Sequence, residues 1–188
     1  YRLYVMVGLP NEDENDIKAV VDMLFRLKQY MEKLGSKGTL TLSINPFIAK
    51  PCTPFQWSAM ADLKQTEKYF KYIKSELKKY KNIEVQFEST KESFSQGILA
   101  RGDRKISQVI YEAHLNGGSK AFKRALKTFK INADDYLYRN FDKEELLPWD
   151  SLDMGFTKDY LWKELQTALQ EKHTIQCFDG CKRCGVCK

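Results

Sequence analysis

The amino-acid sequence predicts an α/β fold with about three strands, followed by a helical region and a cysteine-rich tail. Three observations lead to this prediction. Strand-like apolar segments alternate with amphipathic segments up to residue 90, helical spacing dominates from residue 91 onward, and four of the five cysteines lie between residues 177 and 187. Alternating strands and helices are typical of a parallel sheet.

The predicted sheet lies within residues 1–90. Residues 2–7 form an almost uninterrupted apolar run that ends at Gly8, which indicates a strand buried on both faces. An acidic stretch and then apolar residues at helical spacing predict a helix that ends at Gly35. Further along, the sequence predicts a strand over residues 39–47, a basic amphipathic helix over residues 59–80 and a strand over residues 83–88.

The second predicted strand has one apolar and one polar face. Alternation places Leu40, Leu42 and Ile44 on one side and Thr39, Thr41, Ser43 and Asn45 on the other. In a barrel wrapped by helices, the apolar face lies against the helices and the polar face lines the interior, where a ligand would meet hydroxyl and amide groups. The alternative is an edge strand with its polar face in water.

The chain changes character near residue 90, which sets the expected domains: residues 1–90, a helical extension over residues 91–172 and a cysteine-rich tail over residues 173–188. The predicted helices of the extension cover residues 91–101, 104–115, 119–129 and 156–170, with a short turn near residues 133–138.

The 188 residues carry a formal net charge of +6, and much of the lysine excess lies in residues 64–81. These lysines have helical spacing, so they form either a solvated helix face or a phosphate-binding stripe. The positive charge is therefore compatible with RNA as a partner, but it does not require one. No segment approaches the roughly 18 consecutive apolar residues of a membrane helix, and no secretory signal opens the chain, so we expect a cytoplasmic protein without a membrane partner. Because the chain starts inside an apolar run, we expect it to be the C-terminal piece of a longer protein.

The cysteine-rich tail is the strongest motif. Cys177, Cys181, Cys184 and Cys187 have the spacing C-x3-C-x2-C-x2-C. Without a secretory signal, such clusters indicate metal or redox sites before disulfides. Structural zinc sites more often separate two cysteine pairs by about a dozen residues or more, whereas compact runs are typical of iron–sulfur ligation. We therefore expect a [4Fe-4S] cluster, with zinc as the alternative, and with disulfides or free thiols as further alternatives.

The segment from Arg101 to Arg104, with sequence RGDR, lies between two predicted helices. One interpretation is an interhelical turn in which Asp103 caps the next helix and both arginines lie at the surface. The other is an anion site, in which Arg101 and Arg104 bind a phosphate or carboxylate.

An ordered set of motifs resembles the radical S-adenosylmethionine (SAM) family. Residues 5–12, VMVGLPNE, resemble the strand and "GLP-x-E" turn in the second half of radical SAM barrels, with Asn11 where the family often has glycine. The loop from Asn45 to Trp57 resembles the proline-rich loop that follows the next strand there. Together with residues 100–104, residues 147–150 and the cysteine tail, the chain resembles the C-terminal part of uncharacterised radical SAM proteins that carry a cobalamin-binding-like N-terminal domain.

The resemblance implies a partial TIM-type (radical SAM) barrel and, in the intact protein, SAM-dependent radical modification of an unknown substrate. In that family a [4Fe-4S] cluster reduces SAM to a 5′-deoxyadenosyl radical, which abstracts a substrate hydrogen. The resemblance also implies that Gly8 lies close to SAM and that Thr41, Ser43 and Asn45 face SAM or the substrate. The alternative for Gly8 is that it only makes the turn after the strand. Catalytic residues stay unknown.

The same resemblance limits what these 188 residues would do alone. About three strands cannot close a barrel, so we expect the fragment to be inactive without the N-terminal part of the same chain, through which any cobalamin would bind. The tail follows a terminal helix instead of an early strand, so its cluster would be auxiliary and distinct from the SAM-cleaving one. The alternative function is a non-catalytic module that binds RNA or protein with its basic helices and a zinc-knuckle-like tail.

Overall fold

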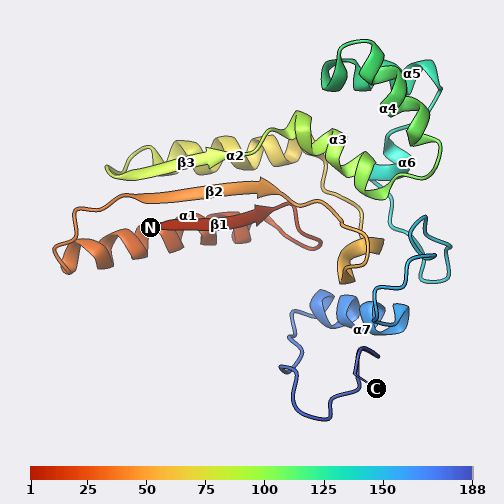
Figure 1. The fold of residues 1–188 in the computed structure, drawn as a ribbon. Helices are drawn as coiled ribbons and strands as arrows, with labels where there is room; N and C mark the ends of the chain where they lie inside the picture. The colour runs from red at the N-terminus through yellow and green to blue at the C-terminus, as the bar shows by residue number, and fades with distance from the viewer. Residues whose placement is uncertain (188) are drawn as a thin grey trace. The chain divides into compact units, whose positions relative to one another are not determined.

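The computed structural model describes residues 1–187 and divides into two compact units (Figure 1). Unit 1 comprises Tyr1–Phe47 and Met60–Phe94, and unit 2 comprises Ile48–Ala59 and the residues from Ser95 onward. The α/β class predicted from the sequence is confirmed. Across the described residues, every helix is too short or too polar to cross a bilayer.

Unit 1 is a parallel sheet with its crossover helices. The strands β1 (Arg2–Val7), β2 (Leu40–Pro46) and β3 (Ile83–Phe87) lie side by side in sequence order. The helix α1 (Glu14–Lys33) connects β1 to β2, and α2 (Leu63–Leu77) connects β2 to β3. Both helices bury their apolar stripes in one core with the apolar side chains of the strands, so both cover the same face of the sheet.

Side-chain caps fix where these helices begin. The carboxylate of Asp13 accepts the N–H groups of Asn15 and Asp16, and the carboxylate of Asp16 accepts the N–H of Asp13, which completes a capping box at the start of α1. The carboxylate of Asp62 caps α2 by accepting the N–H of Lys64 at 2.9 Å. The acidic stretch seen in the sequence is thus a helix start.

The expectation that β1 is buried on both faces is wrong. Tyr4 is 72% exposed and Met6 is 53% exposed, whereas Val7 is buried in the core. The helices α1 and α2 cover only one side of the sheet, and Tyr4 and Met6 lie on the other. Tyrosine and methionine tolerate both environments, so the apolar run concealed an alternating strand.

Unit 2 is helical. Its elements are α3 (Thr90–Arg101), which begins in unit 1, followed by α4 (Ile106–Leu115), η2 (Gly118–Ala121), α5 (Phe122–Thr128), α6 (Asp134–Leu137) and α7 (Lys158–Leu169), together with η1 (Pro54–Trp57). The helix predicted over residues 119–129 begins at Phe122 because Gly117 and Gly118 have left-handed φ values and a 3-10 turn precedes it.

The proline-rich loop of residues 48–59 folds with the C-terminal half of the chain. The side chain of Gln56 accepts the N–H of Cys52 at 3.0 Å and the indole N–H of Trp149 at 2.6 Å. The N–H of Phe141 donates to the carbonyl of Trp57 at 2.8 Å. The tryptophans therefore belong to a core cluster, whose buried members are Trp57, Phe141, Leu147, Trp149, Leu161 and Leu165.

Candidate functional site

The polar residues of β2 line the sheet face opposite α1 and α2, which we call the open face. Parallel pairing places Thr41 between Arg2 and Glu84. The members of the open face are Arg2, Tyr4, Met6, Thr41, Ser43, Asn45, Glu84 and Gln86. The predicted alternation of β2 is confirmed, because Leu40, Leu42 and Ile44 are buried in the core of the sheet and helices. β2 is the middle strand of the described sheet, so the edge position in the alternative is wrong, although Asn45 on the polar face is exposed as that alternative expects.

Gly8 stands at the carboxyl end of β1 but does not belong to the open face. Its φ is +91°, and a Cβ at this position would lie 3.0 Å from the Cβ of Ala61. Its N–H donates to the carboxylate of Glu12, whose own N–H donates to the carbonyl of Leu9 at 3.1 Å. Burial raises the pKa of Glu12, and the hydrogen bond from Gly8 opposes that rise. The turn and the close approach of Ala61 therefore account for the glycine.

Asn11 completes the same turn. It has a φ of +66°, in the left-handed region where glycine and asparagine are the residues most readily accommodated. Asparagine therefore suits this position of the turn.

The cysteine tail folds back onto Thr157, the N-cap residue of α7 (Lys158–Leu169). The carbonyl of Cys184 accepts the N–H of Thr157 at 2.9 Å. Gly185 has a φ of +87°, and a Cβ there would lie 3.0 Å from the Cγ2 of Thr157. Cys181 is buried, Cys184 is half-buried, and Cys177 and Cys187 are exposed. The left-handed φ of Gly185 and the close approach of Thr157 therefore explain why glycine occupies this position.

Arg183 organises the electrostatics of the tail. Its Nε donates to the Sγ of Cys181 at 3.1 Å, and its Nη2 donates to the carbonyl of Ile175 at 2.9 Å. Hydrogen bonds from Arg183 lower the pKa of Cys181 to about 7. The pKa of Cys177 is raised, first by the charge of Cys181. Within residues 1–187, no three His, Cys, Asp or Glu side chains form a group that could hold a metal ion, so the thiols are near one another without forming a coordination shell.

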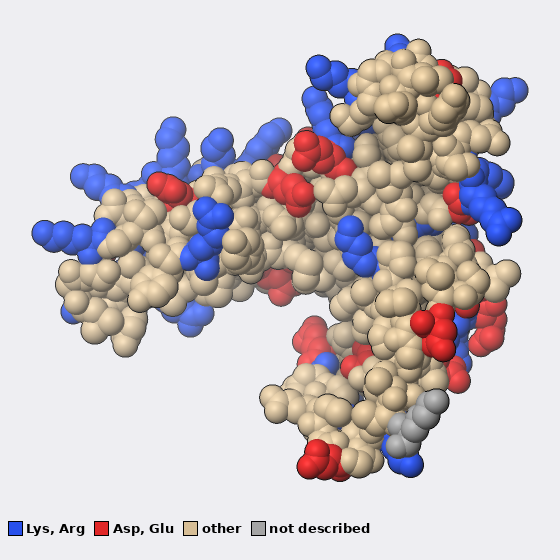
Figure 2. Space-filling model, in the orientation of Figure 1, with Lys and Arg blue, Asp and Glu red and all other residues tan. Residues whose placement is uncertain are grey.

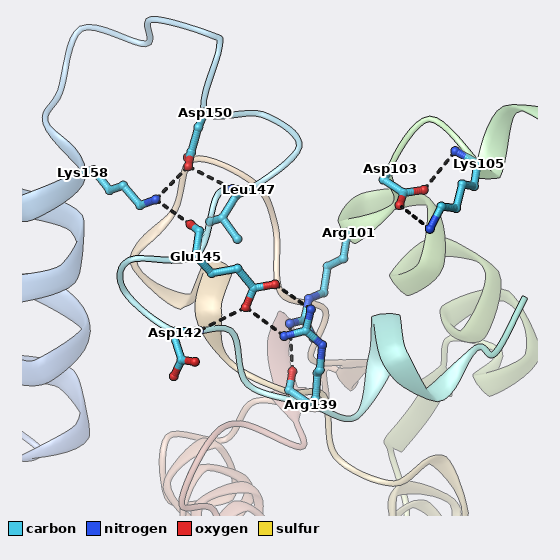
Figure 3. Close-up of polar contacts among 9 residues, drawn as sticks. All are labelled: Arg101, Asp103, Lys105, Arg139, Asp142, Glu145, Leu147, Asp150 and Lys158. Atoms are coloured by element: carbon cyan, nitrogen blue, oxygen red, sulfur yellow. Dashed lines mark hydrogen bonds and ion pairs between the residues drawn. The ribbon is translucent and has the colours of Figure 1, made fainter.

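The RGDR segment contributes the buried Arg101 to a cluster with the exposed Arg139 in unit 2 (Figure 3). Arg101 donates to the carbonyls of Leu137 at 3.3 Å and Arg139 at 2.9 Å, and its guanidinium lies 3.9 Å from the ring centroid of Phe141. Arg139 in turn forms a bidentate pair with Glu145, at 2.6 and 2.8 Å.

The expectation that both arginines of the RGDR segment lie at the surface is wrong for Arg101, which is buried. Arg104 is exposed, whereas Arg139 lies beside Arg101. The expected N-cap is also wrong: Lys105 occupies the cap position of α4 without a side-chain cap bond, and Asp103 accepts the N–H of Lys105 at 2.9 Å. Because Arg101 and Arg139 are 38 residues apart, no local sequence pattern indicates their contact.

The lysines of α2 lie on its outer side. Figure 2 shows blue side chains along the part of unit 1 that carries this helix. The exposed members are Lys64, Lys68, Lys71 and Lys74. Exposed lysines along one side of a helix are expected both of a solvated face and of a phosphate-binding stripe, so this arrangement agrees with either interpretation.

The chain is similar to an uncharacterised protein, MJ0966, of Methanocaldococcus jannaschii. The two are 34% identical over 142 residues, which cover 76% of this chain and 29% of that protein. No family model matches the chain. No solved structure matches it either. The chain thus spans less than a third of the length of a relative that is itself uncharacterised.

Proposed function

We propose that the chain is the C-terminal part of a radical SAM iron–sulfur enzyme, and that the intact protein modifies a substrate by SAM-dependent radical chemistry. The observation that carries this proposal is the sheet, in which three parallel strands follow one another in sequence order with both crossover helices on one face. A (β/α) barrel and one half of a doubly wound sheet both contain such a unit, but a doubly wound sheet is covered by helices on both faces and is apolar on both. The polar open face therefore favours the barrel.

The exposed side chains of β1 also support an arc of a barrel. In a closed barrel the open face becomes the interior, so Tyr4 and Met6 would be covered by strands from the rest of the protein. The outer strands β1 and β3 would pair with those strands, since exposed strand edges are normally covered. The partial coverage of the longer relative leaves room for such strands.

The polar residues of β2 suit SAM, which carries ribose hydroxyls, an amino group and a carboxylate. Thr41, Ser43 and Asn45 offer hydroxyl and amide groups in a row on one strand. Asn45 is nearest the carboxyl end, where (β/α) barrels bind their ligands. When bound next to a reduced [4Fe-4S] cluster, SAM supplies the radical chemistry. In this proposal β2 orients the ligand, and Gly8 lies at the same carboxyl end of the sheet.

The tail suits an auxiliary [4Fe-4S] cluster held by Cys177, Cys181, Cys184 and Cys187. Such clusters need thiolates, and Arg183 favours the thiolate of Cys181 through its hydrogen bond. The other thiols lie in a segment with neither helix nor strand, so binding would order the tail around the metal. Zinc at the same thiolates is the rival, and it belongs to the alternative of a non-catalytic module that binds RNA or protein.

The experiment that tests the proposed activity uses the longer protein that contains this chain, purified anaerobically. With dithionite as reductant, it should convert SAM to 5′-deoxyadenosine and methionine, measured by mass spectrometry. A protein that contains iron and sulfide but releases no 5′-deoxyadenosine would contradict the proposal.

A further inference from the structure

Unit 2 contains a cleft that the proposed function does not use. Its volume is about 540 Å³, and it opens beside the arginine cluster. Its walls come from the end of α3, residues 129–136 and residues 139–148.

Arg101 lines this cleft as a buried cation, and Glu145, whose negative charge favours the protonated form of Arg101, is hydrogen-bonded to Arg139 instead. The Arg101 side chain is 1% exposed, and its Nε has no hydrogen-bond partner among the described residues. In the part of the chain that the structure describes, no ion pair joins it to a carboxylate. The two carbonyls and the ring of Phe141 solvate the guanidinium but do not neutralise it. Burying such a charge is costly unless an anion compensates it.

The acidic side chains of the cleft are already engaged. Asp103 accepts the hydroxyl of Tyr136 at 3.2 Å and lies 3.9 Å from the Nζ of Lys105. Both oxygens of Glu145 are held by Arg139. The lining therefore presents more positive than negative charge; its charged members are Arg101, Lys105, Lys130 and Arg139 against Asp103, Asp135 and Glu145.

We propose that this cleft binds an oxyanion, the phosphate or carboxylate group of a ligand, at Arg101 and Arg139. Guanidinium groups bind such anions through paired, charge-assisted hydrogen bonds. Glu145 accepts two of the five N–H donors of the Arg139 guanidinium and leaves the others for a ligand, although its negative charge opposes anion binding. Burial and the nearby Arg139 lower the pKa of Arg101 to about 10, so this cation stays charged at neutral pH.

The test is a titration of the 188-residue chain with inorganic phosphate and, separately, with malonate, at constant ionic strength in chloride. NMR follows the Nε–H resonance of Arg101, and calorimetry gives the affinity. We expect a saturable shift of that resonance with at least one of the two anions, and the anion that binds identifies the group as phosphate or carboxylate.

Matched variants assign the site. Arg139→Gln should weaken binding about tenfold, since it removes a charged hydrogen-bonding partner, while Arg104→Gln, at an exposed arginine outside the cleft, should change it less than about twofold. Glu145→Gln should tighten binding because it removes a negative charge from the cleft, unlike Glu144→Gln, whose side chain is 89% exposed. The proposal is overturned if neither anion shifts the Arg101 resonance, or if Arg104→Gln weakens binding as much as Arg139→Gln.

Discussion

The carboxylate of Glu12 accepts the main-chain N–H of Gly8 at the end of β1. The N–H of Glu12 donates to the carbonyl of Leu9, so the glutamate closes the turn in both directions. Glycine is required at the first position by its φ of +91° and by the nearby Ala61. The sequence GLPNE therefore has a structural explanation that holds for any function of the chain.

The first prediction concerns Gly8→Ala. A left-handed conformation costs a non-glycine residue roughly 1–2 kcal/mol, and the added Cβ would also meet Ala61 at 3.0 Å. We expect the free energy of unfolding to fall by about 3 kcal/mol in urea denaturation, from the conformational cost and the contact together. Gly35→Ala is the control, because Gly35 has a φ of +71° with no atom within 4 Å of the added Cβ, and should cost only about 1 kcal/mol. Equal losses in the two variants would show that the contact with Ala61 contributes nothing.

The second prediction concerns Glu12→Ala. The change leaves the part-buried N–H of Gly8 without its acceptor, which should lower the free energy of unfolding by about 1–2 kcal/mol. Glu14→Ala removes an exposed glutamate from the first turn of α1 and should cost less than about 1 kcal/mol. Chemical denaturation at neutral pH measures both. If the two substitutions have the same effect, the hydrogen bond to Gly8 does not stabilise the turn.

The third prediction concerns the pH dependence of stability. Hydrogen bonds from Arg139 lower the pKa of Glu145 below its ordinary value of 4.5. The carboxylate therefore stabilises the fold at and above that ordinary value, and this contribution is lost as the pH falls through the lower value of the folded state. The Tm of the wild-type chain should exceed that of Glu145→Gln at pH 7, and the difference should shrink below about pH 4. A Tm difference that stays constant from pH 7 to pH 3 would contradict the assignment.

The fourth prediction concerns the open face in the longer protein. Asn45→Leu should reduce SAM cleavage without lowering the Tm, because Asn45 is exposed at the carboxyl end of β2. Thr41→Val should act in the same direction. Thr39→Val makes a similar change before β2 begins, and should leave the cleavage rate unchanged. Normal cleavage by Asn45→Leu, or a large fall in its Tm, would mean that this side chain packs and does not bind.

Local patterns in the sequence were sufficient for most of the fold. The period of apolar residues located the strands and the long helices to within a few residues, since α1, α2 and α7 each have one buried stripe. The alternation in β2 also predicted its polar face, because a central strand with one covered side repeats with a period of two.

Features that depend on distant contacts could not be predicted. Which face of β1 is buried depends on the side of the sheet that α1 and α2 cover. The run from Leu3 to Val7 has apolar or aromatic side chains on both faces, so its pattern does not indicate the buried one. Gln56 belongs to unit 2 through its bond to the indole of Trp149, which lies 93 residues away. The contact between Arg101 and Arg139 likewise joins residues that are far apart in the sequence. Arg104 is nearer to Arg101 in the sequence, but it is exposed.

The metal content of the tail tests the central claim most directly. After anaerobic reconstitution with iron and sulfide, the 188-residue chain should contain about four iron and four sulfide and absorb broadly near 400 nm. Cys52→Ala removes the cysteine outside the tail and should leave these values unchanged. The double change Cys181→Ala and Cys184→Ala should abolish the absorption while circular dichroism shows the helices intact. If the wild-type chain instead takes up one zinc ion and no sulfide, the tail is a zinc knuckle and the iron–sulfur assignment is contradicted.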